Sequence, residues 1–109
     1  MKRAVLAVTI AASSSNAFAE PNNCTQASFL FSKLAVAAVN CNFPDSPEIN
    51  KPLAVFADVA RHYCGNGPAS RWPGTKVGGM AFYKEVRSKG RGAVCGRIYG
   101  EFLGARPSR

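Results

Sequence analysis

NKPLAVFADVARHYCG, residues 50–65, is the most regular helical stretch of the chain, and the other segments are arranged around it. Its apolar side chains recur at i, i+3, i+4, i+7, i+10 and i+11, which is one stripe of an α-helix. These side chains are Leu53, Phe56, Ala57, Ala60, Tyr63 and Cys64. Asn50 is the expected N-cap, Pro52 falls in the first turn, and Gly65 can adopt the left-handed conformation that ends a helix. The stretch predicts a helix with one buried face.

The first residues of the chain, 1–19, have the organisation of a secretory signal peptide. Lys2 and Arg3 form a charged start, a short apolar segment follows, and the sequence Ala-Phe-Ala ending at Ala19 is a typical cleavage site. The apolar segment is shorter than the ~20 residues that a membrane-spanning helix needs, and no later segment qualifies. We therefore expect a single small helical domain over residues 20–109, with a short basic C-terminal tail and a periplasmic or secreted location.

The segment N-terminal to the opening stretch predicts a first helix. Residues 24–41 are rich in alanine, carry a single charge at Lys33 and show a broad apolar face, so we expect a largely buried helix. Asn22 or Asn23 can cap it. Residues 42–47 contain two prolines and an aspartate, which cannot continue the helix and predict a loop that turns the chain back.

Two more helices are expected in the C-terminal half. Residues 65–79 contain five glycines and two prolines, and predict the longest irregular connection. Residues 80–88 predict a short third helix that begins near Val77. Residues 93–103 predict a fourth helix, because their apolar side chains recur four residues apart. The fold is therefore predicted to be all-α, a compact bundle of about four helices.

Four cysteines follow the predicted signal peptide, an even number that favours two disulfides in an exported chain. If the first helix is continuous, Cys24 and Cys41 lie at its opposite ends, about 25 Å apart, and cannot pair. Sequential helices joined by short loops are antiparallel, so each end of the first helix meets a different partner. We predict the disulfides Cys24–Cys64 and Cys41–Cys95. Such covalent links are expected because a core of this size is only marginally stable by itself.

The chain offers few groups for catalysis: one histidine, six acidic residues and no glycine-rich phosphate loop. Asp58 and His62 are four residues apart and can meet on one flank of their helix, with Ser70 as a conceivable nucleophile. We prefer the interpretation that Asp58 and His62 form an exposed ion pair. A small hydrolase or metal-dependent site built on these two residues is kept as an alternative. No cofactor is indicated, since a lone histidine seldom makes a metal site and no cysteine pair has C-x-x-C spacing.

Positive charge is the other functional signal in the sequence, with the alternative that the basic residues only solvate the outer faces of the third and fourth helices. Without Lys2 and Arg3, 12 basic residues remain against 6 acidic ones, and most of the basic residues lie in the C-terminal half, beside the only tryptophan. A cationic exported protein is attracted to anionic lipid headgroups, acidic glycans and acidic proteins. The residues predicted to bind such a partner are Arg71, Trp72, Arg87, Lys89, Arg91 and Arg97.

Three functional hypotheses follow from these observations. The first is a non-enzymatic binding protein that contacts an anionic protein or envelope surface; nucleic acid is a minor option, because no base-reading motif is present. Trp72 would either stack on the ligand or, in the interpretation we prefer, close the end of the core as a lid. The second is the hydrolase or metal-dependent site named above. The third is a structural or chaperone-like subunit of an envelope assembly.

Overall fold

The computed structural model describes residues 21–104, and every regular element in that range is helical. The predicted signal peptide, residues 1–19, and the predicted basic tail, residues 105–109, lie outside the described residues. The elements are α2 (Cys24–Asn40), α3 (Pro47–Cys64), the short 3₁₀ helix η1 (Ala69–Arg71), α4 (Thr75–Lys89) and α5 (Arg91–Gly104). The predicted all-α class is confirmed for the described part of the chain.

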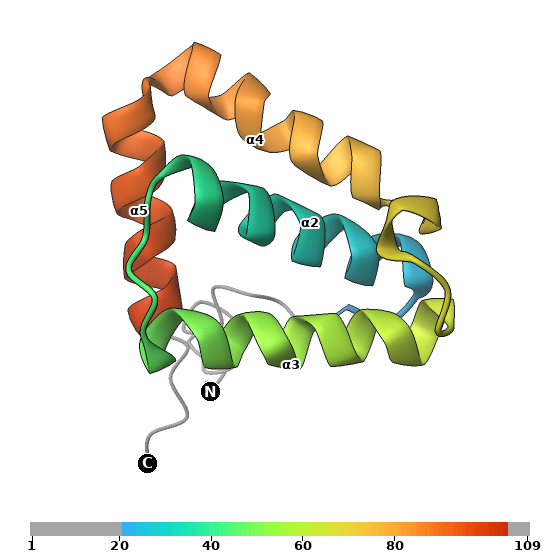
Figure 1. Cartoon of the computed structure of the whole chain (residues 1–109). Helices are drawn as coiled ribbons and strands as arrows, with labels where there is room; N and C mark the ends of the chain where they lie inside the picture. Colours follow the sequence, from blue (N-terminus) through green and yellow to red (C-terminus); the bar gives the residue numbers. More distant parts are fainter. Residues whose placement is uncertain (1–20, 105–109) are drawn as a thin grey trace, which may run out of the picture.

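The four α-helices form a bundle in which α2 is the central member (Figure 1). α3 lies along one side of α2 and α4 along the other, while α5 crosses the end at which α4 finishes. Successive helices joined by short loops run antiparallel, so α2 and α4 point in the same direction and α3 in the opposite one. A helix with neighbours on two sides needs a broad apolar surface, which explains why Lys33 is the only charged residue of α2. The predicted bundle is confirmed.

The N-terminal caps of the first two helices were predicted with different success. Asn23 caps α2 as expected, because its side-chain oxygen accepts a 2.8 Å hydrogen bond from a backbone N–H of the first turn. The prediction that Asn50 caps the next helix is wrong, since α3 already begins at Pro47 and its N-cap is Ser46. Proline has the fixed φ that suits a first helical turn, so Pro47 is well placed at the start of the helix. Pro52 was expected in the first turn, which is wrong, because it lies inside the helix.

α4 and α5 are longer than predicted. α4 begins at Thr75, within residues 65–79 that were expected to be irregular, and α5 begins at Arg91 rather than near residue 93. Gly65 ends α3 as predicted: its φ is +95°, and its N–H donates a 2.8 Å hydrogen bond back into the last turn. The early start of α4 follows from its packing against α2, described below.

Both predicted disulfides are present. Cys24–Cys64 joins the start of α2 to the end of α3, with Cα atoms 4.9 Å apart. Cys41–Cys95 joins the C-cap of α2 to α5, with Cα atoms 5.7 Å apart. The bridged residues are 40 and 54 positions apart in the chain, for which loop-closure entropy gives about 4 kcal/mol per bridge. Each end of the central helix is therefore fixed by one disulfide.

The apolar core has two parts, one at each end of α2. The larger part lies at the end of the Cys41–Cys95 disulfide and consists of Leu34, Ala37, Ile49, Phe82, Val94, Ile98 and Phe102. The smaller part surrounds Trp72, which is 7 % exposed and packs with Ala27 and Ala60. Phe31 meets the indole at an edge, with ring centroids 6.3 Å apart. A buried position of this kind fits the interpretation in which Trp72 closes the end of the core as a lid.

α2 and α4 approach each other closely because two glycines face the backbone of α2. A Cβ atom added at Gly74 would overlap the carbonyl oxygen of Thr25, and one added at Gly78 would overlap the carbonyl oxygen of Phe29. Backbone atoms cannot move aside as the end of a long side chain can, so only glycine allows this contact. The two glycines are four residues apart and therefore share one face of the helix start.

Two buried serines complete the contact between α2 and α4. The hydroxyl of Ser28 accepts a 2.8 Å hydrogen bond from the N–H of Gly74, and the hydroxyl of Ser32 donates a 2.6 Å hydrogen bond to the carbonyl of Thr75. These bonds satisfy buried polar groups that would otherwise destabilise the core. They also tie the first turn of α4 to α2, and so fix which side of α4 faces solvent.

Candidate functional site

α4 has two apolar faces, and only one of them belongs to the core. Gly78 and Phe82 are buried, and Val86 packs against the larger part of the core. Val77 and Met80, in contrast, are 57 % and 59 % exposed. Because successive residues of a helix are about 100° apart around its axis, this exposed stripe lies on roughly the opposite side from the buried one. α4 is at the edge of the bundle, and no described helix covers its outer side (Figure 1).

The outer face of α4 forms a shallow groove of about 500 Å³, which we call the α4 groove. Apolar and basic side chains line it together: Val77, Met80, Ala81, Tyr83, Lys84 and Arg87. Ala81 has the smallest of these side chains and lies one turn from both Val77 and Lys84, which accounts for the hollow. The hydroxyl of Tyr83 lies 3.4 Å from the side-chain oxygen of Asn40 on α2, so the tyrosine stands at the rim.

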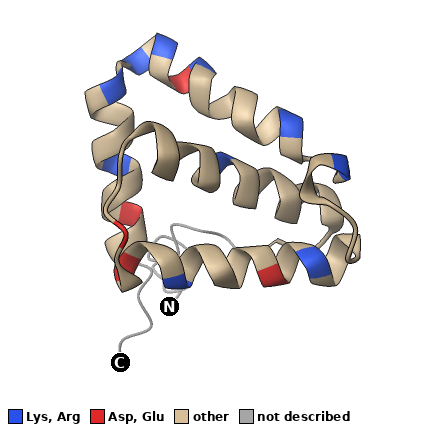
Figure 2. Ribbon diagram, in the orientation of Figure 1, with Lys and Arg blue, Asp and Glu red and all other residues tan. Residues whose placement is uncertain are grey.

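Lys and Arg residues lie along α4 and near both of its ends (Figure 2). Lys84 and Arg87 line the groove, while Lys76 and Lys89 lie at the two ends of the helix. Within residues 21–104, neither Lys84 nor Arg87 takes part in an ion pair. Figure 2 shows acidic residues gathered on the other side of the bundle, where α3 begins and α5 ends. The α4 groove thus combines exposed apolar surface with uncompensated positive charge.

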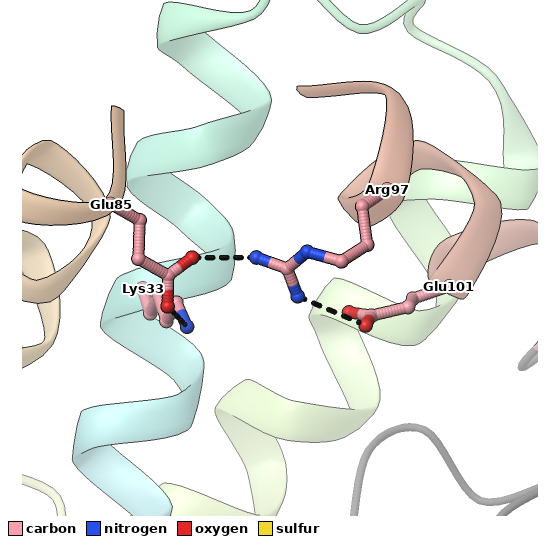
Figure 3. A network of polar contacts seen from close by, with 4 residues as sticks. All are labelled: Lys33, Glu85, Arg97 and Glu101. Carbon is pink, nitrogen blue, oxygen red and sulfur yellow. Dashed lines mark hydrogen bonds and ion pairs between the residues drawn. The ribbon is translucent and has the colours of Figure 1, made fainter. Parts of the chain in front are cut away.

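The one acidic residue of α4, Glu85, is compensated by an ion-pair network (Figure 3). Its carboxylate accepts hydrogen bonds from Lys33 at 2.6 Å and from Arg97 at 2.5 Å, and Arg97 also pairs with Glu101 at 3.2 Å. Partial burial by itself raises the pKa of Glu85. The hydrogen bond from Lys33 and the nearby positive charges together outweigh the burial, so the pKa of Glu85 is lowered from its ordinary value. The network ties α2, α4 and α5 together.

Three of the predicted binding residues are occupied within the protein. Trp72 is buried in the smaller part of the core and presents no open ring face. Arg97 is held between two carboxylates. Arg91 donates a 2.5 Å hydrogen bond to the carbonyl of Asn40, at the end of α2. Their side chains hold elements of the bundle together, so we do not include them in the candidate site.

The other three predicted binding residues are exposed, as Arg91 and Arg97 also are, but these three take part in no ion pair among residues 21–104. Arg71 lies on η1, whereas Arg87 and Lys89 lie in the last turn of α4, where positive charge interacts favourably with the helix dipole. The sequence reasoning missed Val77 and Met80 as parts of a site, together with Tyr83 and Lys84. The signal was present in the sequence: Val77, Met80, Lys84 and Arg87 recur at i, i+3, i+7 and i+10, which is one stripe of a helix.

Asp58 and His62 do not form the ion pair that was expected. Asp58 pairs instead with Arg61, one turn away on the same exposed flank of α3, and the His62 ring meets the edge of Tyr63 with centroids 4.9 Å apart. Asp58, His62 and Tyr63 border a shallow hollow of about 360 Å³. Among residues 21–104, no three His, Cys, Asp or Glu side chains gather as a metal ion would require.

Comparison with known proteins, made with the whole chain, gives no relative: no family model, no curated protein and no solved structure matches it. No helix of the described part is long and apolar enough to cross a membrane. The two disulfides are compatible with an extracellular or periplasmic protein.

Proposed function

We propose that the protein is a small exported cationic binding protein that attaches to an anionic partner or envelope surface through the α4 groove. The observation that carries this proposal is the exposed stripe on which Val77 and Met80 lie beside the unpaired Lys84 and Arg87. Single exposed apolar side chains are ordinary on a protein surface, whereas a grouped set bordered by charge marks an interaction site. Binding by this face needs no chemical reaction.

An exported location is part of this proposal, and the predicted signal peptide and the disulfides support it. In this proposal residues 1–19 are removed as a signal peptide after Ala19, and the domain folds where cysteines are oxidised. The two disulfides of the bundle support such a compartment. The cell envelope and the medium around it offer anionic lipid headgroups, acidic glycans and acidic proteins as partners.

The distribution of charge supports binding in one orientation. The basic residues of α4 lie on one side of the bundle, and the carboxylates of Glu48 and Glu101 lie near the beginning of α3 and the end of α5 (Figure 2). Such a separation of charge turns the basic side of a protein toward an anionic surface before contact is made. The α4 groove is on that basic side, so it would meet the partner first.

Reversal of the two unpaired charges tests this function. We expect Lys84→Glu with Arg87→Glu to elute from a dextran sulfate resin at much lower NaCl than the wild-type protein, because two cations that meet the polyanion become anions. The sample is the exported, oxidised protein with its N-terminus verified by mass. Thermal unfolding followed by circular dichroism should change little, since neither residue forms an ion pair in the described chain and the dipole interaction of an exposed Arg87 is small.

A matched control reverses the same number of charges on α3. Lys51→Glu with Arg61→Glu alters the net charge equally, and both residues are exposed and lie away from α4. Arg61 also pairs with Asp58, but that exposed ion pair is screened by solvent and its loss should matter little. We expect this variant to elute close to the wild-type protein. If the two double variants elute at the same salt concentration, binding depends on net charge alone and the α4 groove is not the site.

A further inference from the structure

The apolar part of the α4 groove indicates which kind of anionic partner it meets. A hydrophilic polyanion would be bound by Lys84 and Arg87 without any help from apolar side chains. The groove nevertheless places Val77, Met80 and Tyr83 beside these charges, all of them more than two-fifths exposed. An apolar stripe bordered by lysine and arginine is typical of helices that lie in the interface of an anionic bilayer.

We propose that the α4 groove docks on the surface of an anionic phospholipid bilayer, an inference that rests on the binding function proposed above. In this arrangement α4 lies parallel to the membrane plane, with Val77 and Met80 at the boundary of the acyl chains. Lys84 and Arg87 have long apolar stems, so their charged ends reach the phosphates while the stems stay in the apolar layer. Tyr83 stands at the rim of the groove, where its hydroxyl stays in contact with Asn40 of α2 and its partly exposed ring adds apolar surface next to the headgroups.

The shape of the site favours a bilayer over a folded protein partner. Hot spots between proteins are usually side chains seated in a pocket of the partner or clefts that receive such side chains. Here the apolar side chains stand on the outside of a single helix at the edge of the bundle, and the groove between them is shallow. A shallow and widely exposed helix face of this kind fits a flat and deformable surface, into which its side chains can sink together.

The fold presents this face without a rearrangement. The inner side of α4 is held by Phe82 in the core and by the contact of Gly78 with the backbone of α2. The Cys41–Cys95 disulfide fixes the start of α5, which follows α4 directly. Only the outer side chains of α4 therefore enter the bilayer, and docking requires no helix to cross it. Lys76 and Lys89 add positive charge along the same helix.

Removal of the apolar side chains without any change of charge tests the proposal. The exported, oxidised protein should bind vesicles of phosphatidylglycerol in phosphatidylcholine and should not bind vesicles of phosphatidylcholine alone. We expect Val77→Ser with Met80→Gln to lower the partition coefficient on the anionic vesicles about tenfold, because two exposed side chains no longer transfer from water to the acyl boundary. The salt concentration at which this variant leaves dextran sulfate should be that of the wild-type protein.

The matched control removes apolar side chains elsewhere. Val55 on α3 is 57 % exposed, as Val77 is, and Val39 on α2 is 75 % exposed. Val55→Ser with Val39→Ser should bind the anionic vesicles like the wild-type protein.

The outcomes separate this proposal from the function on which it rests. Two results would overturn docking on a bilayer and leave an acidic glycan or protein as the partner. One is charge-dependent retention on dextran sulfate without vesicle binding. The other is vesicle binding that Val77→Ser with Met80→Gln leaves unchanged. Failure to bind either the resin or the vesicles overturns both proposals. If the Val77 and Val55 double variants lose the same amount of vesicle binding, the contact is not specific to α4, and docking through the α4 groove is overturned.

Discussion

Both faces of α4 carry apolar residues, but one face is buried in the bundle and the other is exposed to solvent. On the inner face, Gly78 lies against the backbone of α2 and Phe82 is fully buried. On the outer face, Val77 and Met80 stand in solvent beside basic side chains. Hydrophobic periodicity predicts that a segment is helical, but it does not say which of two apolar stripes is buried. Here glycine decides, because a neighbouring backbone can approach closely only on the side without a side chain.

The largest effect that separates the two faces is expected at the glycine contact. Gly78→Ala should lower the free energy of unfolding by about 1–3 kcal/mol, because the new methyl group overlaps the carbonyl oxygen of Phe29 and the two helices must move apart. Urea unfolding monitored by circular dichroism measures the change.

The neighbouring glycine provides the control for this substitution. A Cβ at Gly79 would lie 3.5 Å from a methyl group of Val36, which is an ordinary van der Waals contact. Gly79→Ala should leave the protein as stable as the wild type or more stable by up to ~1 kcal/mol, since alanine favours a helix over glycine. If both alanine variants unfold at the same urea concentration, the close approach of α2 and α4 is not what fixes the inner face.

A smaller effect is expected at Glu85, on the flank between the two faces of α4. Its pKa is lowered in the folded protein, so its contribution to stability is complete above the ordinary glutamate pKa of about 4.3 and is lost as the pH falls through the lower folded value. Glu85→Gln should therefore be less stable than the wild-type protein at pH 7, and the difference should shrink toward pH 3. Urea unfolding at the two pH values measures it.

Asp58→Asn is the control for the pH series. Asp58 also carries an ion pair, with Arg61, but its side chain is 72 % exposed, so solvent screens the interaction. The variant should differ little from the wild-type protein at either pH. A stability difference for Glu85→Gln that persists unchanged from pH 7 to pH 3 would mean that the charge of Glu85 does not support the contact of α2, α4 and α5.

Large apolar residues and cysteines made most of the fold predictable. Val94, Ile98 and Phe102 recur four residues apart, which predicted one stripe of a helix. In the structure all three side chains lie in the larger part of the core. The disulfide pairing followed from helix lengths and from the antiparallel order of the helices, and both bridges are present. These features depend on local periodicity and on end-to-end distances along a helix, which a sequence expresses directly.

Small residues made the remainder unpredictable. Gly74 and Gly78 were interpreted as parts of a loop, because glycine usually interrupts a helix, and the buried Ser28 was not singled out as their partner. The role of each residue depends on a partner that is distant in the sequence. The hydroxyl of Ser28, for example, bonds to the N–H of Gly74, which is 46 positions away. The outer stripe of α4 was missed because Val77 lay where the predicted loop ended and the third helix was expected to begin, so its side chain was not assigned to a helix face. Among the predicted binding residues, Arg87 and Lys89 are the two that lie on the helix of the candidate site, and they were chosen for their charge alone.

The central claim is that the outer face of α4, and not another exposed apolar site, enters an anionic bilayer. The most direct measurement compares Val77→Trp with Val55→Trp on phosphatidylglycerol vesicles whose acyl chains carry bromine, which quenches an indole in contact with it. Both sites are 57 % exposed, and the buried Trp72 contributes the same background to each variant. The account predicts that bromine quenches the indole at position 77 and leaves the one at position 55 unchanged. Equal quenching at the two positions, or none at position 77 while the protein is bound, would contradict it.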